Sequence, residues 1–291
     1  MPFAAGGPTD ALARLLGQRM SEELKQPIVV ENVGGAASVL GTARAAKAAP
    51  NGYTILINDL ALPSAPMLKS NLPFDVRADF VPLGLINAGP KVLIGRKSLQ
   101  ADTAEQLFKK IKTDKADIKL GHGGIGTNSH MCGLLVQRAL GVTVTSVAYR
   151  GTGPAMNDLV AGTLDIICDQ STTAIPQVQA ASVVAYGVTS TTRIAAIPDV
   201  PTLAEVGLTG FDFVIWHGLY APKGTPDEVV QGLNRALNSS LDDPAIRKRY
   251  AEMGRTEFAA DQRTPVAHKA RLDAEVQRLR RLLHGAGFTP E

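Results

Sequence analysis

The sequence predicts a two-domain α/β protein. Short apolar strands alternate with amphipathic helices along the chain, which is typical of sheets covered by helices on both faces. The 291 residues exceed one usual domain and suffice for two. Two glycine-rich loops lead into helices about 120 residues apart, a separation of one domain's length. We therefore expect two domains that each present one such loop.

Composition narrows the functional classes. Hydrophobic residues make up 45% of the chain and charged residues 20%, as in globular proteins. Lysine and arginine exceed aspartate and glutamate by only 30 − 27 = 3, and aromatic residues amount to 5%. This small positive surplus and the few stacking side chains argue against nucleic acid as a partner. No apolar run approaches the roughly 18 residues of a membrane span.

The first ten residues have the pattern of a loop that leads into a helix. Gly6 and Gly7 let the backbone approach a ligand closely, and Pro8 suits the first helical position. Free N–H groups and the positive end of the helix dipole favour an anion there. Asp10, in the first turn, fits a capping or dipole-compensating role. The segment predicts a site for a small carboxylate or phosphate.

In the first half of the chain, strands and helices follow one another with short polar breaks. Asn58 and Asp59 follow an apolar strand, at the end where open α/β sheets bind ligands. The predicted helices span 11–24 and 39–48, and the predicted strands span 27–32, 53–57, 83–87 and 92–95.

The second half repeats the alternation and ends in helices. A second glycine-rich loop, 119–130, leads into a helix, and Asp169 and Gln170 follow another apolar strand. Two domains that aim helix N-termini at a shared cleft would clamp an anion. The predicted helices span 104–112, 131–140, 154–161, 226–241, 244–254 and 265–283, and the predicted strands span 142–149, 164–168, 183–189 and 213–219.

An enzyme is the competing interpretation of the second loop. Gly121, Gly123 and Gly126 spell the G-x-G-x-x-G dinucleotide pattern, but the next strand carries no acidic residue for a ribose. Arg150, which follows that strand, could meet a 2′-phosphate, so NADP binding stays open as an alternative. No G-x-S-x-G elbow supports acyl transfer.

Histidine and cysteine do not form a recognisable metal site. His122 and His130 are eight residues apart, which matches no common zinc spacing, and we interpret each as a structural hydrogen-bonding residue. Cys132 and Cys168 lie in apolar or helical surroundings. We interpret them as small buried residues, with one disulfide as the alternative. We expect no metal, no cofactor and no catalytic residue.

Eight segments resemble one protein family, in the same order along the chain. They are P-F-A-A-G-G-P-T-D (2–10), E-N-V-G-G-A-A (31–37), P-N-G-Y-T-I-L (50–56), G-I-G-T-N-S-H (124–130), Y-R-G-T-G-P-A-M-N-D-L-V-A-G-T-L-D (149–165), P-D-V-P-T-L-A-E-V-G (198–207), W-H-G-L-Y-A-P-K-G-T-P (216–226) and L-N-R-A-L (233–237). Together they resemble the Bug-type, TctC-like solute-binding proteins, the extracytoplasmic receptors of tripartite tricarboxylate transporters. The resemblance covers essentially the whole chain.

The resemblance implies a two-lobed, type II-like periplasmic-binding-protein fold, each lobe a mostly parallel sheet flanked by helices. It places lobe one at 1–92 and 219–291, lobe two at 97–214, and hinge crossings near 92–96 and 215–219. It also implies a monomeric, periplasmic receptor without enzymatic activity. Such a receptor captures a small organic carboxylate by ligand-driven closure and delivers it to membrane transporter subunits. A stand-alone carboxylate sensor is the other non-enzymatic alternative.

The family also implies the ligand site. Its loops that match 3–10 and 124–130 hold a ligand carboxylate from opposite lobes, largely through backbone N–H groups, hydroxyls and ordered water. The implied ligand-binding residues are Phe3, Ala5, Gly6, Gly7, Asp10, Gly126, Thr127, Ser129 and His130. Four residues at strand ends, Asn58, Asp59, Asp169 and Gln170, are expected near the distal end of the ligand.

Two features depart from the family pattern. Members usually carry a signal peptide and a first strand that runs into the first glycine-rich loop, whereas Met1 stands where that strand would end. We therefore expect the sheet of lobe one to lack its first strand. His122 and Gly123 stand where the family often has small hydroxyl residues, so we expect one side-chain donor to the ligand to be missing.

Overall fold

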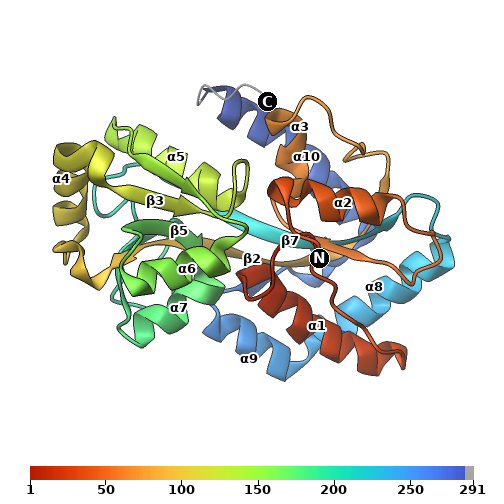
Figure 1. Ribbon diagram of the computed structural model, residues 1–291. Coiled ribbons are helices and arrows are strands. Elements are labelled where there is room, and N and C mark those ends of the chain that lie inside the picture. The colour runs from red at the N-terminus through yellow and green to blue at the C-terminus, as the bar shows by residue number, and fades with distance from the viewer. Residues whose placement is uncertain (286–291) are drawn as a thin grey trace. The chain divides into compact units, whose positions relative to one another are not determined.

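The computed structural model describes residues 1–285 and divides the chain into two compact units (Figure 1). Unit 1 comprises Met1–Ala88, Trp216–Tyr250 and the described residues from Thr256 on, and unit 2 comprises Gly89–Ile215 and Ala251–Arg255. The chain passes between the units within two strands, β2 (Phe80–Arg96) and β7 (Val214–Pro222), and again on either side of the short segment Ala251–Arg255.

Unit 1 is built on short antiparallel pairings. The strand β1 (Leu56–Asn58) pairs with β7, and β8 (Thr256–Glu257) pairs with β2 at Asn87 and Ala88. The helices that belong to this unit are α1 (Pro8–Leu24), α2 (Val39–Ala46), α3 (Ala61–Leu68), α8 (Asp227–Asp242) and α10 (Pro265–Gly285), and two 3₁₀ turns are η1 (Ala36–Ser38) and η4 (Ala260–Arg263).

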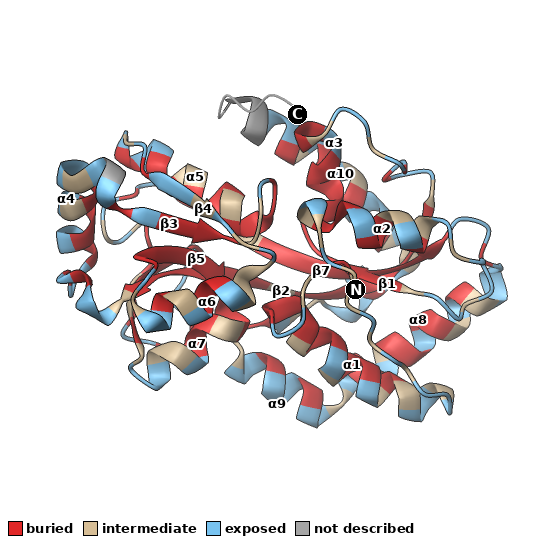
Figure 2. Ribbon diagram, in the orientation of Figure 1, coloured by how far each residue is buried: buried red, intermediate tan, exposed pale blue. Residues whose placement is uncertain are grey.

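The core of unit 1 is formed largely by amphipathic helices. Leu12, Leu16 and Met20 recur every fourth residue on α1 and are buried, as are Leu233 and Leu237 on α8. This spacing places the apolar side chains on one face, and α1 packs against α8 (Figure 2). The sequence period thus determines which face of each helix is covered.

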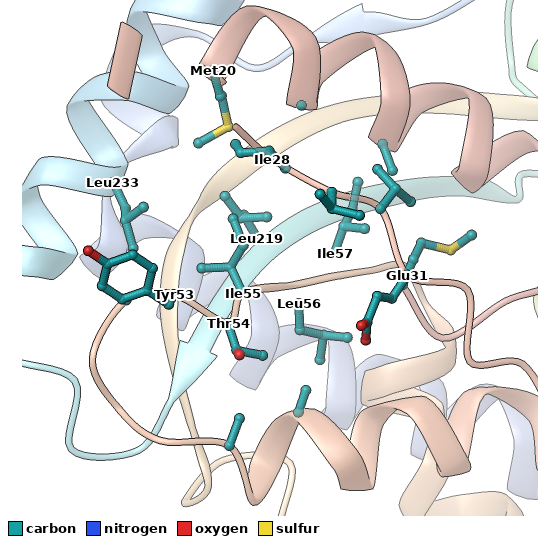
Figure 3. Close-up of a pocket in the computed structure, with 18 of the residues that line it drawn as sticks. Met20, Ile28, Glu31, Tyr53, Thr54, Ile55, Leu56, Ile57, Leu219 and Leu233 are labelled. Carbon is teal, nitrogen blue, oxygen red and sulfur yellow. The ribbon is translucent and has the colours of Figure 1, made fainter. Parts of the chain in front are cut away.

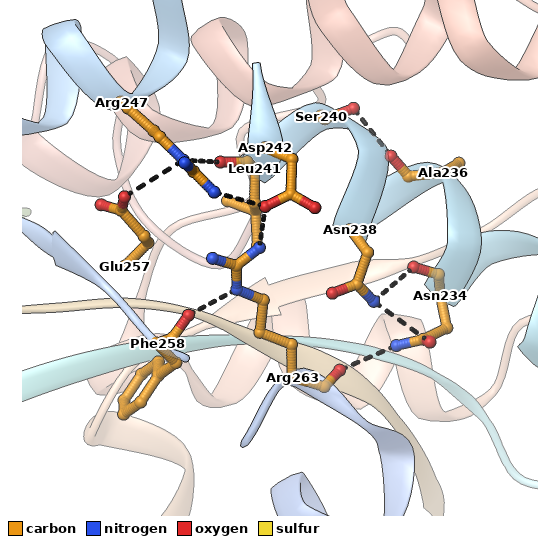
Figure 4. Close-up of polar contacts among 10 residues, drawn as sticks. All are labelled: Asn234, Ala236, Asn238, Ser240, Leu241, Asp242, Arg247, Glu257, Phe258 and Arg263. Carbon is orange, nitrogen blue, oxygen red and sulfur yellow. Dashed lines mark hydrogen bonds and ion pairs between the residues drawn. The ribbon is translucent and has the colours of Figure 1, made fainter. Parts of the chain in front are cut away.

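A polar network ties the end of α8 to its neighbours in unit 1 (Figure 4). The Asp242 carboxylate accepts from Arg263 at 2.9 Å and from Arg247 at 2.6 Å. The hydrogen bond from Arg263 is the main cause that holds the pKa of Asp242 below its ordinary value. Asn234 Nδ2 donates to the carbonyls of Leu83 at 2.7 Å and Arg263 at 2.8 Å, which attaches α8 to β2 and η4.

Unit 2 contains a mixed sheet with helices packed against it. The strand β3 (Lys119–His122) is parallel to both β4 (Thr145–Ala148) and β5 (Ile166–Gln170), whereas β5 and β6 (Val183–Val188) are antiparallel to β2. The helices that lie in this unit are α4 (Ala104–Asp114), α5 (Asn128–Leu140), α6 (Thr152–Ala161) and α7 (Ser171–Gln179), with 3₁₀ turns η2 (Lys97–Leu99) and η3 (Lys115–Asp117). The helix α9 (Pro244–Glu252) spans the boundary at Tyr250.

The alternation of strands and helices matches the predicted α/β class, but several strands differ. The sheets are mixed and not mostly parallel, because β2 and β7 pair antiparallel with their neighbours. The two strands predicted at 83–87 and 92–95 are the single long strand β2. The predicted strand 27–32 forms no ladder within the described residues, and only the end of 53–57 belongs to β1.

The sequence analysis predicted no helix at α3 or at α7. The helices α3 and α7 each contain a proline, Pro66 and Pro176, and proline normally breaks a helix interior.

The described residues include no helix that is long and apolar enough to cross a membrane.

A disulfide joins Cys132 of α5 to Cys168 of β5, with Cα atoms 6.1 Å apart. The preferred interpretation of these residues as separate small side chains was wrong, and the alternative of one disulfide is correct. Both residues are fully buried, so each satisfies the apolar pattern that suggested packing alone. The bond fixes the start of α5 to the strand that ends in Asp169 and Gln170.

Candidate functional site

The first candidate site is the loop 3–10 with the start of α1, in unit 1. The helix begins after Gly7, which provides no side-chain cap, and Pro8 occupies the first turn. Gly6 has φ +77°, a left-handed conformation that favours glycine. A Cβ atom added at Gly7 would meet only the Ala4 carbonyl oxygen, at 3.7 Å. The start of α1 thus presents backbone N–H groups that the Gly7 position leaves uncapped, as an anion site requires.

Asp10 stabilises this loop through hydrogen bonds. One carboxylate oxygen accepts from Gly6 N at 3.0 Å and from Arg14 Nε at 3.1 Å, and the other accepts from Asn32 Nδ2 at 2.9 Å. Burial raises the pKa of Asp10, but the hydrogen bonds from Arg14, Asn32 and Gly6 outweigh it and hold the pKa below its ordinary value. Asp10 is therefore an ionised support of the loop, and its predicted direct contact with a ligand stays a prediction.

The segment that follows the predicted strand 27–32 packs against the loop. Asn32 Nδ2 also donates to the Phe3 carbonyl at 3.2 Å. A Cβ atom added at Gly34 would lie 3.0 Å from Ala4 N, so any larger residue would push the first loop away. Two of the motifs that suggested the family, 2–10 and 31–37, are thus in direct contact.

A buried relay joins α1 to the two long strands within unit 1. Thr9 Oγ1 lies 3.2 Å from His217 Nε2 on β7, and His217 Nδ1 lies 3.1 Å from Asn87 Oδ1 on β2. With the ring proton on Nδ1, the Thr9 hydroxyl donates to Nε2. All three side chains are buried. The relay fixes the first turn of α1, and the sequence analysis did not single out His217 or Asn87.

Asn58 and Asp59 lie at the end of β1, as expected, and both are buried. Asn58 Nδ2 donates to Thr42 Oγ1 at 3.1 Å, and Asn58 Oδ1 accepts from Asp59 N at 2.8 Å. Asp59 Oδ1 accepts from Ala61 N at 2.9 Å, at the start of α3. These contacts shape the turn from β1 into α3, and a role of the two side chains toward a ligand stays a prediction.

The second candidate site is the loop 122–130 and the start of α5, in unit 2. Thr127 is the N-cap, and its hydroxyl accepts from His130 N and donates to the Gly124 carbonyl at 2.7 Å. Ser129 Oγ accepts from Gly123 N at 2.9 Å and lies 2.9 Å from Thr127 Oγ1. Gly124 and Gly126 have φ of +118° and +86°, which favour glycine. The predicted residues Gly126, Thr127, Ser129 and His130 therefore form one cluster.

Two histidines line this second loop as neutral acceptors. Gly124 N donates to His122 Nδ1 at 3.1 Å, and Gly126 N donates to His130 Nδ1 at 3.2 Å. Burial lowers the pKa of His122, and burial together with the nearby His122 lowers the pKa of His130 to about 4. Both rings therefore carry their proton on Nε2 at neutral pH. His122 Nε2 lies 2.9 Å from Ser146 Oγ.

Asp169 and Gln170 end β5, next to the second loop. Because β3 and β5 are parallel neighbours, the loop after β3 and the end of β5 meet at one edge of the sheet. Asp169 Oδ2 accepts from Thr173 Oγ1 at 2.5 Å, and its buried Oδ1 has no hydrogen-bond partner among the described residues. A ligand hydroxyl or amino group would satisfy that oxygen.

Gln170 has a partner that the sequence analysis missed. Its Oε1 accepts from Arg255, whose Nε donates to Thr172 Oγ1 at 2.9 Å. Arg255 lies 85 residues further along the chain, within the short segment 251–255 that returns to unit 2. No local pattern marks such a residue, because only the fold brings it to β5.

The glycine pattern in the second loop has a packing cause. A Cβ atom at Gly121, inside β3, would lie 2.3 Å from Leu164 Cδ2, and one at Gly123 would lie 3.2 Å from the Gly151 backbone. Close packing therefore accounts for two of the three glycines of the dinucleotide pattern.

Comparison with known proteins places the chain in a family. The model of the tripartite tricarboxylate transporter family receptor matches residues 12–285. A UPF0065 protein of Agrobacterium vitis is 42% identical over 287 residues, which cover 99% of this chain and 83% of that protein. BugT of Bordetella pertussis is 31% identical over 280 residues, which cover 96% of this chain and 85% of that protein.

Solved structures confirm the predicted periplasmic-binding-protein fold. The periplasmic binding protein BugD is 38% identical, with a TM-score of 0.96 over 100% of this chain and 97% of that chain. MatC from Rhodopseudomonas palustris, with bound malate, is 36% identical, with a TM-score of 0.92 over 97% and 96%. R. palustris Rpa4515, with adipate, is 27% identical, with a TM-score of 0.95 over 100% and 96%.

The family also decides between receptor and enzyme. Its members are solute-binding receptors, so the prediction of a non-enzymatic protein is confirmed, and the alternative of an NADP-dependent or acyl-transfer enzyme is wrong. The whole-chain match and the fold agree with the motifs that first suggested the family. The chain belongs to the tripartite tricarboxylate transporter family receptors and is a Bug-type solute-binding protein.

Proposed function

We propose that this receptor binds a small organic carboxylate through its two glycine-rich loops, 3–10 and 124–130, and delivers it to the membrane subunits of a tripartite tricarboxylate transporter. The observation that carries the proposal is the start of α1, where Gly7 provides no side-chain cap for the backbone N–H groups. The ionised Asp10 does not cap them either, because its two oxygens accept from Gly6 N and Asn32 Nδ2. Two similar structures hold malate and adipate, which are both dicarboxylates.

The proposed chemistry relies on backbone dipoles and hydroxyl groups. At the first loop, the N–H groups of the α1 start would donate to one ligand carboxylate. At the second loop, Thr127 and Ser129 would supply hydroxyls beside two neutral histidines. Asp169 Oδ1 would accept from a donor group on the ligand, such as a hydroxyl. Such fixed dipoles can hold an anion without an arginine clamp.

The proposed location is the periplasm, with the receptor acting as a monomer. Family membership supports the location, since the similar protein BugD is a periplasmic binding protein. The disulfide between Cys132 and Cys168 is a second support, because disulfides persist in oxidising compartments.

The Gly7→Asp substitution tests the first loop. The new Cβ fits, since its nearest contact is 3.7 Å away, and Gly7 has an ordinary φ of −84°. A second carboxylate at the start of α1 would repel the ligand, so we expect a loss of affinity of at least about a hundredfold. Calorimetric titration with malate and adipate measures it.

Two control variants distinguish the effect of a negative charge at position 7 from the effect of added side-chain volume there and from the effect of a negative charge elsewhere on the protein. Gly7→Ala adds only the Cβ and should weaken binding much less than Gly7→Asp. Gly232→Asp adds the same charge on α8, where a Cβ meets only Arg235 at 3.9 Å, and should leave affinity unchanged. Affinity retained in Gly7→Asp would refute the assignment of the first loop.

Delivery to a transporter needs its own experiment. We expect vesicles that contain the membrane subunits of such a transporter to take up labelled ligand only when this receptor is added. Uptake that is equal without the receptor, or a complex with a sensor ectodomain alone, would favour the sensor alternative.

A further inference from the structure

Unit 1 contains a cavity whose lining is mainly apolar (Figure 3). Its volume is about 720 Å³, and Met20, Ile28 and Leu219 are among the side chains around it. Such a lining offers few hydrogen-bonding groups to a small carboxylate. Groups that could recognise a polar ligand lie elsewhere, at the edge of the sheet in unit 2 where β5 ends.

The end of β5 holds a carboxylate oxygen that the protein itself does not pair. Asp169 is 1% exposed, and its Oδ2 accepts from Thr173 Oγ1 at 2.5 Å. Its buried Oδ1 has no hydrogen-bond partner among the described residues. A buried acceptor without a partner costs stability, and the cost is larger for a charged group. Such an oxygen in a native fold is therefore a candidate for contact with a ligand.

Asp165 shows that the same sheet can satisfy a buried carboxylate. This residue lies directly before β5 and is buried as well. Its Oδ1 accepts from Arg96 Nε at 2.7 Å, and its Oδ2 accepts from Lys119 N at 2.8 Å. The unpaired oxygen is thus a property of position 169 and not of buried carboxylates in this unit.

The side chain of Asp169 lies on the face of the sheet that α6 and α7 cover (Figure 1). Cys168 is disulfide-bonded to α5, and successive side chains of a strand point to opposite faces. Ile167, on the same face as Asp169, belongs to one apolar cluster with residues of α6 and α7. Asp169 follows at the end of the strand, where Thr173 in the first turn of α7 contacts only one of its two oxygens.

The second glycine-rich loop lies beside Asp169. The strand β3 is parallel to β5, and their register pairs Gly121 with Ile167. Two residues later, Gly123 follows at the level of Asp169, about one strand spacing of roughly 4.8 Å away. Ser129 Oγ, one of the hydroxyls of the proposed carboxylate site, accepts from Gly123 N at 2.9 Å. A carboxylate held by these hydroxyls would bring its neighbouring carbon close to Asp169.

We propose, in an inference that rests on the proposed function, that Asp169 selects carboxylates with a hydrogen-bond donor on carbon 2, next to the carboxylate that the second loop holds. The donor is a hydroxyl or an ammonium group, and it satisfies the unpaired Oδ1. An unsubstituted dicarboxylate such as succinate leaves that oxygen buried without a partner. A site built to hydrogen-bond a substituent discriminates strongly against the analogue that lacks it.

The test compares dicarboxylates that differ only at carbon 2. Calorimetric titration of the full chain measures malate against succinate, 2-hydroxyglutarate against glutarate, and 2-hydroxyadipate against adipate, so that three chain lengths are covered. Aspartate and glutamate carry an ammonium group in place of the hydroxyl and show which donor is preferred. We expect at least one substituted ligand to bind about tenfold or more tightly than its unsubstituted partner, because a hydrogen bond to a carboxylate distinguishes the two.

The Asp169→Asn variant tests the residue, and Asp165→Asn is the matched control. Asparagine keeps the size and one oxygen for Thr173, but it can present an NH₂ group where Oδ1 lies. We expect the affinity ratio of substituted to unsubstituted ligand to fall close to one in Asp169→Asn and to keep its wild-type value in Asp165→Asn. Without ligand, Asp169→Asn should not lower Tm, whereas Asp165→Asn should, because it weakens the pairing with Arg96.

The outcomes distinguish this selectivity from the proposed function. Equal affinities within every ligand pair in the wild type would overturn the selectivity and leave the proposed carboxylate site standing. An affinity ratio that survives in Asp169→Asn, with a lowered Tm, would assign Asp169 a structural role and would also overturn it. A wild type that binds no carboxylate of the panel would overturn both proposals.

Discussion

At the scale of single residues, His130 couples the second loop to pH. Its Nδ1 accepts from Gly126 N, and a protonated ring would lose that acceptor. Burial and the neighbouring His122 lower the pKa of His130 from 6.5 to about 4. Between these two values the unfolded chain binds a proton that the folded loop excludes, so stability falls as pH falls from 6.5 to 4.

The His130→Asn variant tests this coupling. An asparagine oxygen can replace Nδ1 as the acceptor for Gly126 N but does not titrate. We expect the free energy of unfolding to drop less between pH 7 and pH 5 in the variant than in the wild type, as measured by urea unfolding at both pH values. Identical drops in the two proteins would contradict a neutral His130 acceptor.

Residue roles were only partly predictable from the sequence. Asp10 is predicted as a first-turn acidic residue and lies there, and its i+4 partner Arg14 follows from the helix. Its partners Gly6 and Asn32 follow from a loop geometry that no local pattern encodes. Arg255 and His217 were missed because they approach Gln170 and Thr9 only after the chain has folded. Glycine positions were more informative, since Gly6 and Gly126 both have positive φ.

At the scale of elements, the N-caps of α5 and α4 form a natural matched pair. Thr127 caps α5 within the second loop, whereas Thr103 caps the surface helix α4 by accepting from Gln106 N at 3.2 Å. Replacing either with alanine should cost about 1 kcal/mol of stability, or roughly 2–4 °C in Tm. Only Thr127→Ala should also weaken carboxylate binding, by about tenfold, because it removes a hydroxyl from the proposed site.

Thermal unfolding and calorimetric titration of both variants separate the two effects. A Thr103→Ala variant that binds as weakly as Thr127→Ala would show that affinity merely follows stability. Unchanged affinity in Thr127→Ala would remove this hydroxyl from the site.

The disulfide between Cys132 and Cys168 links two elements, α5 and β5. It closes a loop of 36 residues between α5 and β5, for which chain entropy predicts about 3–4 kcal/mol of stabilisation. We expect a reducing agent to lower the free energy of unfolding of the wild type by about that amount, which appears as a lower midpoint in urea unfolding. The double variant Cys132→Ala, Cys168→Ala should show the lower midpoint with and without the reductant. A wild type whose fully reduced form unfolds at the same midpoint would contradict a stabilising bond.

Elements with clear periodicity were predictable, and those shaped by neighbours were not. The helices predicted at 226–241 and 131–140 correspond to α8 and α5, although α5 begins earlier than predicted, at Asn128. The stretch 27–32 has the composition of a strand, yet a strand needs a partner, and within the described residues it pairs with none. The antiparallel pairings of β2 and β7 could not be read from alternation alone, because they depend on where each strand crosses between units.

At the scale of the whole molecule, the sequence predicted the fold class and the family more completely than it predicted the details of the site. Alternating strands and helices indicated α/β architecture, and motifs spread from residue 2 to residue 237 indicated one receptor family. The solved relatives confirm both. The chemical identity of the ligand depends on side chains such as Asp169, whose free carboxylate oxygen becomes visible only in the folded unit.

The most direct test of the central claim is a thermal-shift measurement on the full chain with malate, adipate, citrate, phosphate and NADPH. A ligand at 100 times its dissociation constant adds about 2.7 kcal/mol, which at roughly 2–4 °C per kcal/mol is a rise in Tm of several degrees. We expect that rise with one or more carboxylates and none with NADPH. A rise with NADPH alone, or no rise with any carboxylate, would contradict a carboxylate receptor.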